Sequence, residues 1–119
     1  MAESMTDPTA PASPGARQRP APRFPLVLEG QAALITGANS GIGKAVALGL
    51  GASGADVVVN YVTHPETAEE VAHQIEAGGR RALAIKADVS SEEDVQAMFA
   101  KAIGHFGTLH IGVSNAGLA

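Results

Sequence analysis

An apolar run at residues 32–35 (AALI) leads directly into a glycine-rich segment at residues 36–43 (TGANSGIG). A short apolar run predicts a buried strand, and glycines at this spacing predict a tight turn that opens a helix. The N–H groups of such a turn, together with the positive end of the helix dipole, favour an anion. In a strand–turn–helix unit this anion is typically the pyrophosphate of a dinucleotide, so the segment constrains both fold and ligand.

Downstream of this turn, the hydrophobic pattern alternates between strands and helices. Four strands separated by three helices require right-handed parallel crossovers. The expected fold is therefore α/β, with a Rossmann-type doubly wound parallel sheet truncated to four strands in the order 3-2-1-4. The first two helices are expected on one face of the sheet and the third on the other. The ligand is expected between the carboxyl ends of strands one and four.

The element bounds follow from periodicity and from local stop signals. Strands are expected at about residues 32–36, 56–61, 81–86 and 109–114. The first helix is expected at about residues 41–51, the second from Pro65 to the Gly78-Gly79 stop, and the third from a capping box of Ser90 and Glu93 to Gly104 or Gly107. One face of the third helix is expected to pack on the sheet. It comprises Val95, Met98, Phe99, Ala102 and Ile103.

Three segments are expected to meet the dinucleotide. Gly37 permits the tight turn, Gly41 lets backbone N–H groups approach the phosphates, and Gly43 lets the helix pack closely on the sheet. Asn39 and Ser40 offer further hydrogen-bond donors, and the segment after strand four faces the same crevice. The candidate cofactor-binding residues are Gly37, Asn39, Ser40, Gly41, Ile42, Gly43, Asn60, Tyr61, Asp88, Val89, Asn115, Ala116 and Gly117.

The end of the second strand bears on the choice of dinucleotide. An acid there would accept a hydrogen bond from the ribose 2′-OH and repel a 2′-phosphate. This chain has Asn60-Tyr61 instead, and no acid before Glu66. NADP is therefore favoured, or use of both cofactors, and NAD stays open. Asp88-Val89, after strand three, is expected to contact the adenine. The alternative for Asp88 is that it only shapes the turn before the third helix.

Composition limits the other classes of function. The net charge is −4 with no basic face, which argues against nucleic acid as a partner. No apolar run approaches the ~20 residues of a membrane span, and a cytoplasmic location is expected. There is no Cys, and the four His lack ligand spacing, so no metal site is expected. The proline-rich residues 1–25 are expected to be a disordered tail before a partial dinucleotide-binding domain at residues 26–119.

These motifs together resemble the classical short-chain dehydrogenase/reductase family, over about residues 26–119. The glycine segment matches the family's cofactor motif, and Asp88-Val89 matches its adenine contact. Residues 114–117 (SNAG) match its Asn-Asn-Ala-Gly motif except at Ser114, and His110 stands where Asp is usual. The resemblance looks closest to members described as glucose dehydrogenase-like. It implies an NAD(P)-dependent oxidoreductase that acts on an alcohol, carbonyl or sugar substrate.

The family's chemistry uses a Ser, a Tyr and a Lys four residues after that Tyr. The only Tyr here is Tyr61, and Pro65 stands four residues later. No catalytic residue is therefore expected, and the chain is interpreted as the cofactor-binding N-terminal part of such an enzyme. The alternatives are a non-catalytic nucleotide-binding module and a non-functional remnant. Family members are usually homo-oligomers, and this chain is expected to lack that interface and to expose strand four as an edge.

Overall fold

The computed structural model describes residues 26–115, so the predicted tail at residues 1–25 lies outside the described part, as do Ala116 and Gly117. Strands β1 (Ala32–Ile35), β2 (Asp56–Tyr61), β3 (Ala82–Lys86) and β4 (Ile111–Val113) form one parallel sheet in the order β3-β2-β1-β4. Helices α1 (Gly41–Ala52), α2 (Pro65–Ala77) and α3 (Glu92–Phe106) alternate with them. The predicted fold class and strand order are confirmed.

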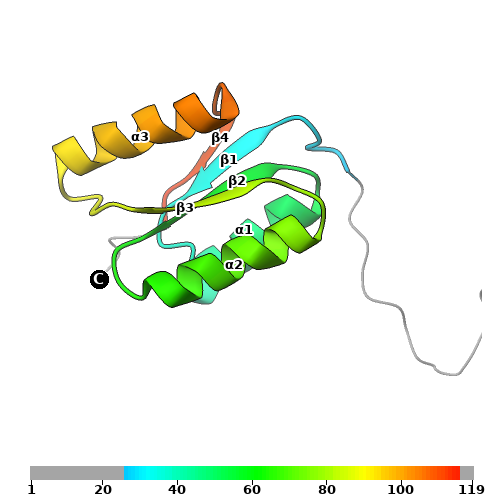
Figure 1. The fold of residues 1–119 in the computed structure, drawn as a ribbon, viewed down its shortest axis with the longest axis horizontal. Coiled ribbons are helices and arrows are strands. Elements are labelled where there is room, and N and C mark those ends of the chain that lie inside the picture. Colours follow the sequence, from blue (N-terminus) through cyan, green and yellow to red (C-terminus); the bar gives the residue numbers. More distant parts are fainter. Residues whose placement is uncertain (1–25, 116–119) are drawn as a thin grey trace, which may run out of the picture.

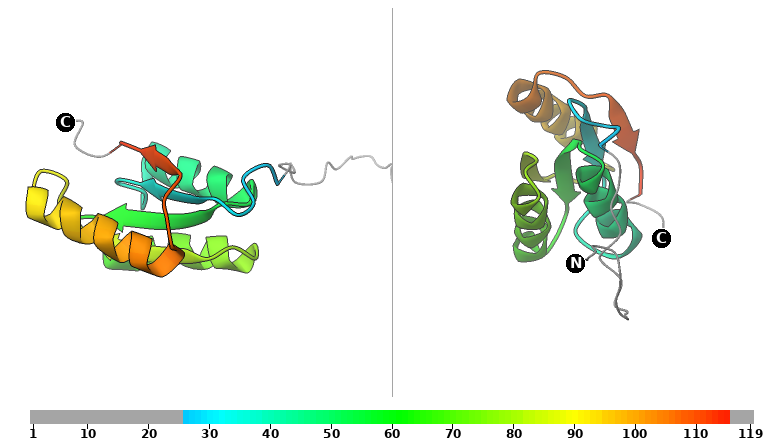
Figure 2. Two further views of the ribbon diagram at one scale, coloured as in Figure 1. Left: turned by 90° about the horizontal axis from the view of Figure 1, so that it is seen from above. Right: turned by 90° about the vertical axis from the view of Figure 1, so that its right-hand side faces the viewer.

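The sheet lies between two helical layers. Figure 1 shows α3 on one face of the sheet and α1 with α2 on the other, and Figure 2 shows the same layers from two further directions. The predicted distribution of the helices is therefore confirmed. With helices on both faces, the central strands must be apolar throughout, and all four residues of β1 are buried.

Successive residues of a strand point to opposite faces, and this alternation divides the core in two. Ile35, Val57 and Val59 belong to the cluster beneath α1 and α2. Leu34 and Val58 belong to the cluster beneath α3. Complete burial of a Val or Ile side chain is worth about 1.5–3 kcal/mol, so both clusters stabilise the sheet.

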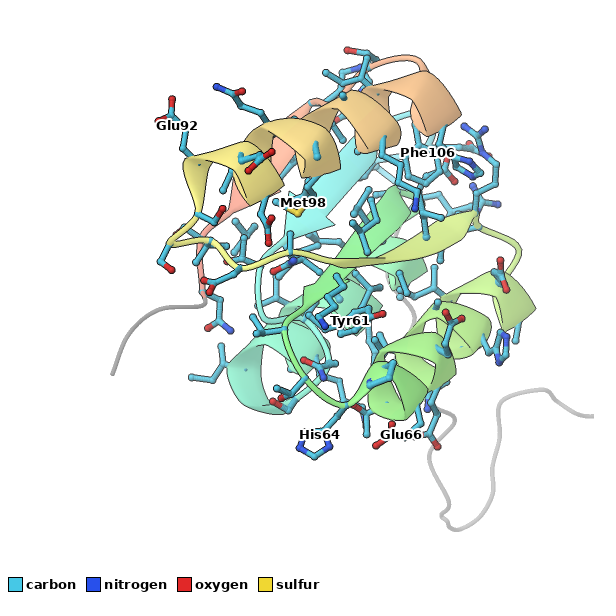
Figure 3. The ribbon with its side chains drawn as sticks, turned by 60° about the vertical axis from the view of Figure 1, so that its left-hand side comes forward. Tyr61, His64, Glu66, Glu92, Met98 and Phe106 are labelled. Carbon is cyan, nitrogen blue, oxygen red and sulfur yellow. The ribbon has the colours of Figure 1, made fainter. Side chains whose placement is uncertain are left out.

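Helix α3 packs on the sheet through a narrower face than the sequence predicts. Met98 and Ala102 are buried, whereas Phe99 is 42% exposed and Ile103 is 46% exposed. Figure 3 shows Met98 pointing from α3 toward the sheet. Phe99 and Ile103 therefore lie at the exposed side of the apolar face that the sequence predicts. Within the described residues, Met98 and Ala102 belong to one buried cluster with Leu34 of β1, Val58 of β2 and Ile85 of β3.

The amino-terminal cap of α3 also differs from the prediction. Ser91 is the capping residue, and its Oγ accepts a hydrogen bond of 3.2 Å from the Asp94 N–H. The Ser90 Oγ instead donates to Asp88 Oδ1 at 2.7 Å. Ser90 is thus part of the turn that Asp88 forms, and the helix begins one residue later than predicted. Strands β1, β3 and β4 are each one to three residues shorter than predicted, and Gly107 rather than Gly104 ends α3.

Two polar links join elements at the amino ends of the strands. The Asp56 carboxylate of β2 accepts from Arg81 Nη2 at 2.8 Å and from the Arg81 N–H at 2.9 Å. The Arg81 guanidinium also lies 4.9 Å from the centre of the Phe106 ring, at the end of α3. This Asp56–Arg81–Phe106 group connects β2, the start of β3 and α3.

The second link joins the starts of β1 and β4 through His110. The His110 Nδ1 accepts from the Ala32 N–H at 3.0 Å, and the His110 N–H donates to the Ala32 carbonyl at 2.9 Å. The side chain thus satisfies a backbone donor of a buried residue. A carboxylate at this position could accept from the same N–H group.

We expect His110→Ala to lower the free energy of unfolding by about 1 kcal/mol, because the Ala32 N–H loses its acceptor. His110→Asp is the matched control, since its carboxylate can still accept, and it should retain most of that stability. Urea unfolding of the full chain measures both variants. Equal stability of the two variants would contradict the proposed role of the imidazole.

Candidate dinucleotide site at the carboxyl ends of β1 and β4

The glycine turn connects the end of β1 to the start of α1. Gly37 has a φ of 62° and Gly41 a φ of 58°, which is the left-handed region that side chains other than glycine rarely adopt. The Lys44 N–H donates to the Ser40 carbonyl at 3.2 Å, so α1 begins within the turn. The N–H groups of a first helical turn have no partner inside their helix, and here they are available at the carboxyl end of the sheet.

Gly43 fixes the distance between the turn and the helix. A Cβ built on Gly43 would collide with the Gly37 carbonyl oxygen and lie 2.6 Å from Asn115 Nδ2. Gly41 is different, because a Cβ built there meets nothing within 4 Å. The backbone of Gly41 therefore faces open space, where a ligand could approach, whereas Gly43 is a packing position.

The segment that follows β4 meets the turn directly. The Asn115 N–H donates to Thr36 Oγ1 at 2.8 Å, and Asn115 Nδ2 donates to the Gly37 carbonyl at 3.3 Å. The Thr36 N–H donates in turn to the Val113 carbonyl at 3.1 Å. The two segments that the sequence analysis placed at one crevice thus lie side by side.

Asn60 lies behind this surface and not on it. Its side chain has no exposed area, and its Oδ1 accepts from the Gly37 N–H at 3.1 Å. Its Nδ2 donates to the carbonyls of Ile85 at 3.3 Å and Ala87 at 3.1 Å. The structure therefore corrects the expectation that Asn60 contacts the cofactor directly. The three valines before Asn60 contain the missed signal, because a strand covered on both faces buries side chains that point to either face.

The Asn39 side chain also forms hydrogen bonds within the protein. Its Nδ2 lies 3.0 Å from the Thr63 carbonyl and 2.9 Å from Thr67 Oγ1, so the amide holds the loop between β2 and α2. In that loop His64 has a φ of 62° and precedes Pro65, the first residue of α2. Figure 3 shows His64 at the outer end of this loop, pointing away from the body of the molecule. Sequence reasoning missed the tether, because it joins residues far apart in the chain.

The other predicted residues are distributed around the turn. Ile42 is 75% exposed, and Ser40 is exposed with no side-chain capping bond to α1. Tyr61 is partly buried against the cluster beneath α1 and α2. Val89 lines a cavity of about 270 Å³ between α3 and the ends of β1 and β4. The other residues that line this cavity are Leu34, Thr36, Val95, Met98, Phe99, Gly112, Val113 and Ser114.

Asp88 shapes the turn between β3 and α3. Its Oδ1 accepts from the Ser90 hydroxyl at 2.7 Å and from the Ser90 N–H at 2.9 Å. These bonds, the one from the hydroxyl first, hold the pKa of the Asp88 carboxyl below its usual value of 3.8. The turn-forming role that the sequence left open is therefore present, and the adenine contact stays a prediction.

We expect Ser90→Ala to raise the pKa of Asp88 toward its usual value. The substitution removes the hydrogen bond from the Ser90 hydroxyl, which lowers this pKa more than the bond from the Ser90 N–H does. In the unmodified chain the lowered pKa stabilises the fold at pH values above the unfolded-state pKa. That contribution is lost as the pH falls through the folded-state pKa. An NMR titration of the Asp88 carboxyl carbon measures the change. Ser91→Ala, which removes the helix cap instead, should leave the pKa low, and an unchanged pKa in Ser90→Ala would contradict the assignment.

Two other kinds of site were considered within residues 26–115. No three His, Asp or Glu side chains in this part come together as ligands for a metal ion. None of α1, α2 and α3, the helices of the described part, is both long enough and apolar enough to cross a membrane. The glycine turn with its neighbouring segments is thus the principal candidate site.

The strand order and the glycine turn together define an α/β domain of Rossmann type. A family model described as short chain dehydrogenase matches residues 31–119. The chain therefore belongs to the short-chain dehydrogenase family. The glucose dehydrogenase-like subtype stays a prediction.

Two curated relatives are similar in sequence to most of this chain. It is 50% identical over 91 residues to versicolorin reductase 1 of Aspergillus parasiticus, covering 76% of this chain and 35% of the relative. It is 48% identical over 94 residues to the hydroxynaphthalene reductase-like protein Arp2 of Metarhizium acridum, covering 79% and 35%. The chain thus spans about a third of the length of the curated relatives it matches.

Solved structures give the same result. A short chain dehydrogenase from Burkholderia cenocepacia J2315, in complex with NADP, matches with a TM-score of 0.74 and 45% identity. That match covers 76% of this chain and 37% of the other. Hydroxysteroid dehydrogenase from Escherichia coli matches with a TM-score of 0.72 and 39% identity, covering 77% and 39%.

Proposed function

We propose that this chain binds NADP or NAD at the carboxyl ends of β1 and β4. It is the cofactor-binding part of an oxidoreductase that acts on an alcohol, carbonyl or sugar substrate. The observation that carries the proposal is the glycine turn, in which Gly43 packs beneath Gly37 and α1 begins at the mouth of the site. Membership of the short-chain dehydrogenase family supports it, because that family uses nicotinamide dinucleotides.

Each part of the dinucleotide has a proposed neighbour. The pyrophosphate lies at the first turn of α1, where the N–H groups of Gly41, Ile42 and Gly43 and the helix dipole favour negative charge. Ser40, whose hydroxyl does not cap the helix, donates to the same phosphates. The adenine lies near Asp88 and against the apolar wall that Val89 contributes to the cavity beside α3. Asn115, beside the turn, borders the nicotinamide end.

We propose a preference for NADP over NAD. Tyr61 and the exposed residues 62–64 at the end of β2 carry no acid that would repel a 2′-phosphate. The first acidic residue after β2 is Glu66, which lies in α2. Its Oε2 is 3.4 Å from His64 Nδ1. The NADP complex of the Burkholderia cenocepacia relative, which is 45% identical, supports this preference.

The chain by itself is proposed to bind the cofactor without turnover. The family's reaction uses a Tyr with a Lys four residues later, and the only Tyr of this sequence is followed at that distance by Pro65. Tyr61 also lies in β2, partly buried against the core. Hydride transfer would therefore depend on residues that this sequence does not supply.

Titration of NADPH into the full chain, followed by the fluorescence of the dihydronicotinamide, tests the proposal. We expect saturable binding, with a lower dissociation constant for NADPH than for NADH, and no oxidation of NADPH by simple ketones or aldehydes. No saturation at millimolar cofactor would overturn the binding proposal and favour the alternative that the chain is a non-functional remnant. Tighter binding of NADH would overturn the NADP preference, and measurable oxidation would overturn the lack of turnover.

A further inference from the structure

We propose that Asn60 is a positioning residue that couples the pyrophosphate turn to the adenine loop. This inference rests on the proposed function, because it concerns how two parts of one cofactor site are held in register. The Asn60 amide links Gly37, in the turn after β1, to Ala87, the residue that precedes Asp88 and Val89. The two linked residues belong to the segments expected to hold opposite ends of the ADP moiety.

The hydrogen-bonding capacity of the amide fits this position closely. A side-chain amide has one carbonyl acceptor and two N–H donors. The Asn60 acceptor receives the Gly37 N–H, and its donors serve the carbonyls of Ile85 and Ala87. Its side chain is completely buried, so water cannot replace any of these bonds. An ionised carboxylate would accept from Gly37 but would face two carbonyl oxygens with no proton to donate.

The backbone around Asn60 strengthens the same connection. Its own carbonyl accepts from the Ala38 N–H at 2.9 Å, and the Tyr61 carbonyl accepts from the Ala87 N–H at 3.0 Å. The end of β2 is thus the element that both ligand-facing segments contact. A rigid ligand that spans both segments binds well only when they keep a fixed separation, because small displacements remove favourable contacts at one end or the other.

This arrangement has a consequence for cofactor choice. An acid at position 60 could not accept from a ribose hydroxyl, since the side chain there is completely buried among Gly37, Ile85 and Ala87. Any residue that discriminates between NAD and NADP at this strand end must therefore lie at Tyr61 or beyond it. Asn60 acts on affinity for the whole dinucleotide and not on recognition of the 2′ position.

Asn60→Asp in the full chain tests the coupling, with Gln74→Glu on the exposed side of α2 as the matched amide-to-acid control. At pH 7.5 we expect the affinity for NADPH to fall about tenfold or more. The reason is that the two ends of the cofactor can no longer contact both protein segments at once. The affinity for adenosine 2′,5′-bisphosphate, which reaches only one end, should fall much less. At pH 5 protonation of the introduced carboxyl restores one donor, so the loss of NADPH affinity should shrink. Gln74→Glu should match the unmodified chain throughout.

Hydrogen exchange of the Gly37 amide gives a readout that needs no cofactor. We expect slow exchange in the unmodified chain and faster exchange in Asn60→Ala, because the Gly37 N–H then loses its Oδ1 acceptor. If Asn60→Asp does not fold at pH 7.5, Asn60→Thr, which retains one donor and one acceptor, replaces it and should show the same selective loss of NADPH affinity.

Equal losses of affinity for NADPH and for the bisphosphate, independent of pH, would show a purely structural role and overturn the coupling. Unchanged NADPH affinity in Asn60→Asp would overturn it as well. If the unmodified chain binds no NADPH, the proposed function fails. The Gly37 exchange then still decides whether Asn60 holds the turn, so the two failures are distinguishable.

Discussion

Gly43→Ala should abolish saturable NADPH binding and lower the free energy of unfolding by about 1–3 kcal/mol. The added methyl group would overlap the Gly37 carbonyl oxygen and approach Asn115 Nδ2 to 2.6 Å, so α1 or the turn has to move. Either movement changes the position of the N–H groups that are proposed to hold the pyrophosphate. Fluorescence titration with NADPH and urea unfolding of the same sample measure the two effects.

Gly49→Ala is the control for this experiment, because it places the same methyl group in the same helix. A Cβ at Gly49 meets nothing within 4 Å, so no displacement is expected. Removing a glycine from a helix interior should raise stability by up to about 1 kcal/mol, and NADPH binding should be unchanged. If Gly43→Ala behaved like Gly49→Ala, the close packing of the turn on α1 would not be needed for binding.

Ile35→Ala should lower the free energy of unfolding by about 2–5 kcal/mol, which is the largest stability effect we expect of a single core substitution. Ile35 has no exposed surface and lies between Val59 of β2 and Val113 of β4 in the sheet register. Its loss leaves a cavity that the parallel strands cannot close without breaking backbone hydrogen bonds. Chemical unfolding followed by circular dichroism measures the change.

Ile103→Ala provides the comparison, since it makes the same chemical change on α3, where the side chain is 46% exposed. Its effect should stay within about 0.5 kcal/mol. Small domains are stable by about 5–15 kcal/mol in total, so the Ile35 substitution alone could populate the unfolded state while the Ile103 substitution could not. Similar losses for the two variants would mean that Ile103 is covered in solution.

The sequence was sufficient to predict the fold, because the decisive signals are local. The three consecutive valines of β2 indicate a strand covered on both faces, and the glycine turn fixes where β1 ends and α1 begins. The Rossmann arrangement that this turn indicates, with right-handed crossovers, then predicts the order β3-β2-β1-β4, which the sheet has. The turn-forming role of Gly37 and the packing role of Gly43 could be predicted for the same reason.

The polar links could not be predicted in the same way. The partners of Asn60, Asn39 and His110 are separated from them by 23 to 78 residues, and no local spacing specifies which backbone groups will lie beside them. Helical periodicity likewise identifies the apolar face of α3, but it does not say how much of that face the sheet covers. Phe99 and Ile103 lie on that face and are nevertheless 42% and 46% exposed.

The Asp56–Arg81–Phe106 group has a consequence for engineering. It holds β2, β3 and α3 together at the amino ends of the strands, whereas the glycine turn and Asn115 lie at their carboxyl ends. The stabilising Asp56–Arg81–Phe106 contacts and the proposed cofactor site thus lie at opposite ends of one sheet. A directed-evolution library could therefore vary Asp56, Arg81 and Phe106 to adjust thermal tolerance without altering the ligand surface. The loops at the carboxyl ends of the strands could be varied separately for new cofactors, with the Asp56–Arg81–Phe106 contacts left unchanged.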